Sequence, residues 1–137
     1  MKRELPDYFI ALVKQKTGLT NNQQTSRAII EIGKTIETSL TPQAANRFFS
    51  VTPAYLRVPK QTFFAKVGNW QKPVSAKEPT DQLMSRLQLT DQEEAKVLLR
   101  AYFAAIQTIT DKETQLKASL SLHGELAKLY IEAKALT

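Results

Sequence analysis

Apolar residues recur at a spacing of three or four along most of the chain, and the alternation typical of strands is almost absent. Such a stripe predicts an amphipathic helix with one buried face. Polar or proline-containing starts divide the stripes into separate helices, and Gly18 is placed to end the first of them in a left-handed conformation. The predicted helices begin near Pro6, Thr20, Thr41, Thr80, Thr90, Thr110 and, for the closing helix, just after Gly124.

The helix starts repeat at an interval of 70 residues. Residues 19–23 (Leu-Thr-Asn-Asn-Gln) correspond to residues 89–93 (Leu-Thr-Asp-Gln-Glu), and in both a threonine precedes Gln or Glu by three positions, which predicts a capping box. A second threonine-led start follows in each copy, at Thr41 and Thr110. The helix after Thr110 continues into Leu116 and Leu120.

Two related helical units that hide each other's apolar faces predict one compact domain. We expect a single all-α domain over residues 1–137, a bundle of about six to eight helices. Its halves would be residues 6–57 and 79–136, joined by a connection over residues 58–78. The chain length of 137 residues and the hydrophobic fraction of 42% fit a domain that buries about two-thirds of its unfolded surface.

Further motifs accompany this layout. The first half has residues 9–13 (Phe-Ile-Ala-Leu-Val) before Gly18-Leu19, then a long helix, a short helix and residues 52–56 (Thr-Pro-Ala-Tyr-Leu). The second half matches at residues 81–84 (Asp-Gln-Leu-Met) and lacks the proline at residues 122–126 (Leu-His-Gly-Glu-Leu). The arrangement resembles a family of small bacterial two-copy helical proteins known as domain of unknown function 2267. The resemblance covers most of residues 8–130 and implies an all-helical fold without an established activity or functional residues.

The composition excludes several classes of chemistry. Without cysteine the chain has no disulfide, zinc–thiolate site, iron–sulfur cluster or cysteine nucleophile. No apolar run approaches the roughly 20 residues that span a bilayer, and the first residues lack the apolar stretch of a secretory signal. We therefore expect a cytoplasmic protein without integral membrane association.

Residues that resemble catalytic groups have structural explanations. His123 is the single histidine and corresponds to Pro53 at a predicted helix start. Glu93, Glu94 and the acids at 111 and 113 lie in first turns of predicted helices, where a negative charge meets the positive end of the helix dipole. The four glycines are scattered and form no phosphate-binding loop. The sequence thus predicts no catalytic residue, no metal ligand and no cofactor.

The positive charge is concentrated in one segment. The net charge of +6 divides into +3 for residues 1–56, +5 for residues 57–77 and −2 for residues 78–137. The segment 57–73 also carries aromatic side chains, and its notable residues are Arg57, Lys60, Phe63, Phe64, Lys66, Trp70 and Lys72. Interleaved cations and rings are suited to an acidic protein partner or to single-stranded nucleic acid, whose bases stack on rings.

The same segment also fits a purely structural role. Phe63, Phe64 and Val67 lie at helical spacing and would anchor the connection in the core, with Trp70 covering the bundle and the lysines in solvent. A membrane-surface helix is disfavoured because two prolines and a glycine interrupt the stretch.

The resulting hypothesis is a non-enzymatic helical interaction module that binds a protein partner through this basic and aromatic surface. Arg57, Lys60, Lys66 and Lys72 would make electrostatic contacts, and Trp70 would be the anchor. The alternative is a nucleic-acid-binding protein that uses the basic segment 57–73.

Overall fold

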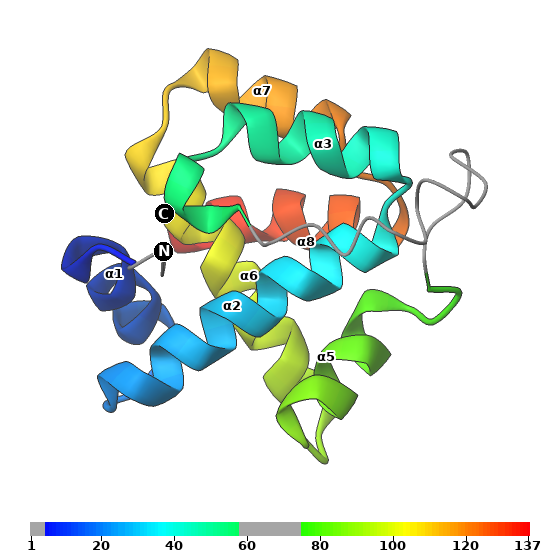
Figure 1. The fold of residues 1–137 in the computed structure, drawn as a ribbon. Helices are drawn as coiled ribbons and strands as arrows, with labels where there is room; N and C mark the ends of the chain where they lie inside the picture. The colour runs from blue at the N-terminus through cyan, green and yellow to red at the C-terminus, as the bar shows by residue number, and fades with distance from the viewer. Residues whose placement is uncertain (1–4, 58–74) are drawn as a thin grey trace.

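The computed structural model describes residues 5–57 and 75–137. This part of the chain forms a compact all-α domain of seven α-helices with two short 3-10 turns and no strand, which confirms the predicted class and helix number (Figure 1). The elements are α1 (Asp7–Thr17), α2 (Asn22–Ser39), α3 (Pro42–Val51), η1 (Ala54–Leu56), α5 (Pro79–Leu87), α6 (Gln92–Ile109), α7 (Lys112–Leu120), α8 (Gly124–Ala133) and η2 (Lys134–Leu136).

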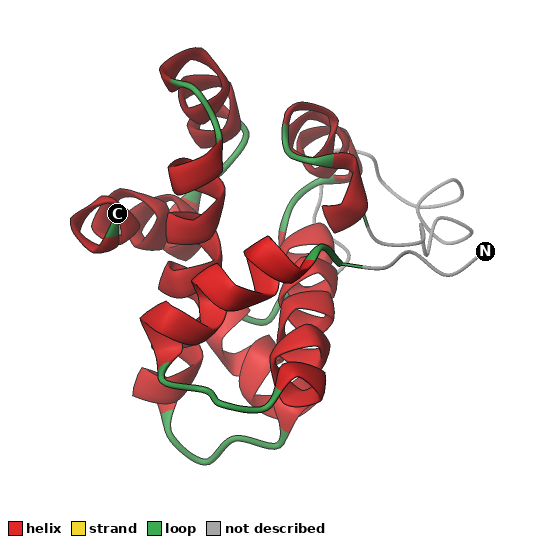
Figure 2. Cartoon of the chain, turned by 90° about the vertical axis from the view of Figure 1, so that its left-hand side faces the viewer, coloured by secondary structure: helices red, strands yellow, loops and turns green. Residues whose placement is uncertain are grey.

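Helix α6 is the centre of the domain. It packs against α1, α2, α5 and α8, whereas α3 and α7 pack against each other. In both views α3 and α7 lie at the top of the molecule, above the helices that surround α6 (Figures 1 and 2). Residues 101–107 of α6 are all buried, and a helix enclosed on every side must be apolar around its whole circumference, as this stretch mostly is.

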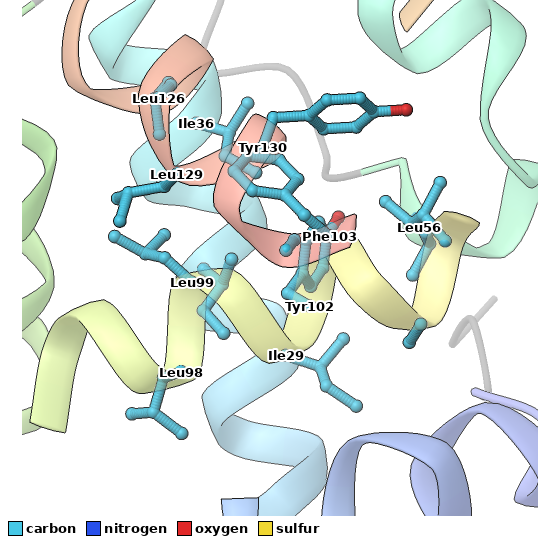
Figure 3. Packing of buried hydrophobic residues seen from close by; sticks show 14 of the residues in the cluster. Ile29, Ile36, Leu56, Leu98, Leu99, Tyr102, Phe103, Leu126, Leu129 and Tyr130 are labelled. Atoms are coloured by element: carbon cyan, nitrogen blue, oxygen red, sulfur yellow. The ribbon is translucent and has the colours of Figure 1, made fainter. Parts of the chain in front are cut away.

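Aromatic rings join α6 to its neighbours. The centre of the Phe103 ring lies 5.2 Å from that of Tyr130 on α8, edge to face (Figure 3). It lies 6.2 Å from the ring centre of Phe48 on α3, in the same kind of arrangement. Tyr102 makes the same kind of contact with Phe9 on α1, at 6.1 Å. Such pairs add about 0.5–1.5 kcal/mol each to the area they bury, so these rings fix α1, α3 and α8 around one helix.

The predicted capping boxes at the starts of α2 and α6 are wrong by one residue. The side chain of Asn21 accepts hydrogen bonds from the backbone N–H groups of Gln23 and Gln24, and Asp91 accepts one from Glu93. The threonines at 20 and 90 precede these caps. Asn and Asp cap at least as well as Thr, so the residue that stands nearer to the first turn takes the role.

The starts of α3 and α7 give one confirmation and one correction. Thr41 caps α3 as predicted, and its hydroxyl accepts from the N–H of Ala44 at 3.1 Å. At α7 the cap is Asp111, which accepts from the N–H of Thr114 at 2.8 Å. Thr110 instead donates to the carbonyl of Ile106 and so belongs to the end of α6.

Two helices end in the left-handed conformation. Helix α1 ends at Gly18 with φ 79°, as predicted. Helix α5 ends at Gln88 with φ 56°, the single non-glycine residue with positive φ in the described part of the chain. A side chain in this region costs roughly 1–2 kcal/mol, so the end of α5 is strained where the end of α1 is not.

Candidate interaction surface

Of the predicted binding residues, Arg57 lies within the described part of the chain, whereas Lys60, Lys66, Trp70 and Lys72 lie outside it. Arg57 is exposed, and its Nε donates to the carbonyl of Phe49 at 3.0 Å. This carbonyl belongs to the last turn of α3, where unpaired carbonyls and the negative end of the helix dipole attract a cation. Arg57 therefore also closes the end of α3, a role that the sequence alone did not suggest.

The chain beyond residue 74 is fastened beside the end of α2. The N–H of Ser75 donates to the carbonyl of Thr38 at 3.0 Å, and the side-chain amide of Gln82 donates to the carbonyl of Lys77 at 2.9 Å. The same amide donates to the hydroxyl of Ser39, also at 2.9 Å. Both ends of the predicted basic connection are thus hydrogen-bonded to the last turn of a helix, α3 at one end and α2 at the other.

Helix α5 is fastened by polar contacts. Gln82 is 5% exposed, and its Oε1 accepts from the hydroxyl of Thr38 at 2.5 Å. Arg86 lies 3.9 Å from Glu31 on α2. At the start of α5 the N–H and the hydroxyl of Thr80 both donate to Oε1 of Glu125 on α8. These directional bonds set the position of α5, and through it the point at which the connection re-enters the domain.

The described residues carry only a small net positive charge. Without Lys2, Arg3, Glu4 and the three lysines of residues 58–74, the net charge falls from +6 to +2. Five cations lie 3.0–3.9 Å from a carboxylate, and they are Lys34, Arg86, Lys96, Arg100 and Lys117. These are five of the fourteen Lys and Arg residues described, so the ion pairs neutralise part of the positive charge, whereas the segment 57–77 contains no acid.

The outward face of α7 carries two large apolar side chains. Leu116 is 61% exposed and Leu120 is 75% exposed, and the two lie one turn apart on the same face. Ala118 is the one buried residue of this nine-residue helix. Leu116 and Leu120 therefore face away from the core. We call these two residues the α7 ridge.

The residues considered for catalysis take structural positions. His123 is exposed and stands directly before α8, at the helix start that the sequence predicted. In residues 5–57 and 75–137, no group of three or more His, Asp or Glu side chains is arranged to hold a metal ion. No described helix is both long and apolar enough to cross a membrane.

Comparison with models of protein families, with curated proteins and with solved structures gave no match to this chain. The resemblance to domain of unknown function 2267 stays a prediction. The function must therefore be argued from the residues themselves.

Proposed function

We propose that the protein is a non-enzymatic helical interaction module that binds a protein partner. The observation that carries the proposal is the α7 ridge, two leucines more than half exposed and one turn apart on an outer helix. Helices dock by placing side chains at this spacing into an apolar groove or against another helix. The basic and aromatic residues of the segment 57–73, with Trp70 as anchor, are proposed as further partner-binding residues.

Charge favours a protein over nucleic acid as the partner. A nucleic-acid surface needs a stripe of cations free to neutralise phosphates. The described body has twelve acids for its fourteen cations, five of which lie beside an acid, so its net charge is only +2. Exposed apolar side chains contribute little to phosphate binding and much to a protein interface.

Nucleic-acid binding is the second candidate, because residues 57–77 carry +5 without an acid. Trp70 is the single tryptophan, so its fluorescence reports on that segment alone. A titration with single-stranded oligonucleotide at low and at high salt separates the two functions. We expect no salt-dependent quenching. Quenching at low salt that disappears at high salt would identify a nucleic-acid-binding protein.

Partner capture tests the leading proposal directly. We expect that the tagged protein retains a partner from a native extract and that the double variant L116N/L120S loses it. A partner retained equally by both proteins would show that the α7 ridge is not the docking surface. Because the chain lacks cysteine, we expect the partner to be captured from the cytoplasmic fraction.

We further propose that the two halves of the domain arose by duplication. Helices α2 and α6 begin at residues 22 and 92 and end at residues 39 and 109, and α3 and α7 begin at residues 42 and 112. The left-handed helix ends at Gly18 and Gln88 are separated by the same interval of 70 residues. One constant interval for starts, ends and a rare backbone conformation supports a common origin of the halves.

A further inference from the structure

Two tyrosines that are distant in sequence meet at the surface of the domain. Tyr8 lies in the first turn of α1 and Tyr55 lies in η1, and the hydroxyl of Tyr8 donates to that of Tyr55 at 2.9 Å. The ring centres are 6.1 Å apart, and the rings stand edge to face. Tyr8 is 54% exposed and Tyr55 is half-buried, so a small solute reaches this pair from solvent.

The chemistry of the chain makes this pair a target for oxidants. The sequence has no cysteine, whose thiolate would otherwise react first. The other two tyrosines, Tyr102 and Tyr130, are buried with their rings against phenylalanines. Burial and the hydrogen bond from Tyr8 raise the pKa of Tyr55 above its ordinary value, so at neutral pH the pair consists of two protonated phenols.

We propose that Tyr8 and Tyr55 form an oxidative cross-linking site, at which a one-electron oxidant joins the two rings as dityrosine. Each phenol loses one electron and its hydroxyl proton. The two radicals then form a carbon–carbon bond next to the carbons that bear oxygen, and the hydrogens displaced there move to the oxygens and restore both phenols. With hydrogen peroxide and a peroxidase as the oxidant, the two electrons and two protons reduce one peroxide to two waters.

The geometry supports coupling between these two rings. The coupling carbon of a phenol is bonded to the carbon that bears oxygen, so the hydrogen bond between the hydroxyls holds the two coupling carbons near each other. The exposed ring of Tyr8 has room to turn and close the remaining gap. The inference goes beyond the proposed interaction function and does not depend on it.

The cross-link has a structural consequence. It closes the chain between residues 8 and 55 into a covalent loop and ties α1 to η1, directly before Arg57 and the basic connection. A closed loop has less conformational freedom in the unfolded chain, as it does when a disulfide forms. The oxidised protein should therefore be more resistant to unfolding.

The first test is photo-oxidation of the dilute full-length protein with ruthenium tris-bipyridyl and persulfate. We expect a monomer with dityrosine fluorescence, whose mass is lower by two hydrogens. Trypsin should release residues 4–14 and 48–57, which contain one tyrosine each, as a joined pair. Y8F and Y55F should lose this product and Y102F should keep it, with circular dichroism showing that each variant is folded.

The peptide map of the wild type decides the proposal even where a variant fails to fold. Dityrosine that joins other tyrosines, that forms only between molecules, or that persists in Y8F would overturn it, as would the absence of dityrosine.

The second test measures the effect of the cross-link on stability. The cross-linked monomer should unfold at a higher urea concentration than the untreated protein. Y8F treated in the same way is the matched control, because it undergoes the oxidation of Trp70 and the methionines without the cross-link. A cross-linked monomer that unfolds no later than oxidised Y8F would overturn the stabilising role of the site.

Discussion

Replacement of Tyr102 by phenylalanine should stabilise the protein. Tyr102 is fully buried in α6, with its ring against Phe9 and Phe103. Within the described residues its hydroxyl has no hydrogen-bond partner. The hydroxyl has therefore left water without a replacement bond, which costs about 1–3 kcal/mol.

The expected change in the free energy of unfolding follows from the contacts that phenylalanine keeps and the hydroxyl that it lacks. Tyr102→Phe keeps the ring and its edge contacts and removes one oxygen, whose void offsets part of the gain. We expect the free energy of unfolding to rise by about 1 kcal/mol. For a chain of 137 residues this raises Tm by about 3–5 °C.

The stabilisation of Tyr102→Phe relative to wild type should increase at alkaline pH. Burial raises the pKa of Tyr102 far above its ordinary value of 10. Above pH 10 the unfolded tyrosine loses its proton while the folded one keeps it, so the folded state is destabilised as the pH rises. The loss approaches about 1.4 kcal/mol per pH unit for one group. Tyr102→Phe removes this contribution, and the difference from wild type should widen above pH 10.

Tyr130→Phe is the matched control. The hydroxyl of Tyr130 donates to the carbonyl of Gln115 on α7 at 3.0 Å. Its removal loses this bond between α8 and α7, so we expect a loss of about 1 kcal/mol. Urea unfolding followed by circular dichroism compares both variants with wild type at neutral pH. If Tyr102→Phe is destabilised as strongly as Tyr130→Phe, the hydroxyl of Tyr102 has a partner in solution and the reasoning is wrong.

Three more predictions concern helix docking and helix ends. Gln82→Ala removes the hydrogen bonds that Gln82 makes with the hydroxyls of Thr38 and Ser39 on α2, and should lower the free energy of unfolding by about 1–3 kcal/mol, measured in urea. Gln88→Gly relieves a left-handed side chain and should stabilise by up to about 1 kcal/mol, whereas Gly18→Ala should destabilise by about as much in the same assay. Hydrogen bonds from Thr114 lower the pKa of Asp111, so its cap supports α7 above pH 3.8 and fails as the pH falls through the lowered value. Amide exchange in α7 should therefore quicken in acid, and Asp111→Asn should remove this acid dependence.

The sequence was sufficient to predict the helices, but it was not sufficient to predict which residues each helix packs against. Helical spacing predicted the all-α class, and Gly18 and Thr41 predicted a helix end and a helix start, because these signals are local. The same spacing groups Leu116 and Leu120 on one face of a helix, and in the structure both are exposed. Periodicity shows that a helix has an apolar stripe, but whether another element covers that stripe depends on packing between distant segments.

The polar docking of α5 also lay beyond sequence reasoning. Gln82 and Thr38 are 44 residues apart, and no local sequence pattern predicts that a glutamine will be buried against a threonine. The hydrogen bond from Arg57 to the carbonyl of Phe49 could not be predicted for another reason. Its acceptor is a backbone carbonyl, which every residue possesses, so no residue type signals it. The charge of Arg57 suggested a partner, and the structure adds a contact within the domain.

Under the proposed duplication, some corresponding positions of the two halves differ both in chemistry and in burial. Gln82 is buried where Leu12 stands 70 residues earlier, and Leu116 is exposed where Asn46 stands. A polar side chain inside and an apolar side chain outside both oppose the simple rule for stability. The buried glutamine fixes the re-entry of the basic connection, and the exposed leucine belongs to the α7 ridge. The first half has exceptions of the same two kinds, because Ser39 is buried where Ile109 stands and Ile30 is exposed where Arg100 stands, so neither half alone kept the pattern of a purely structural unit.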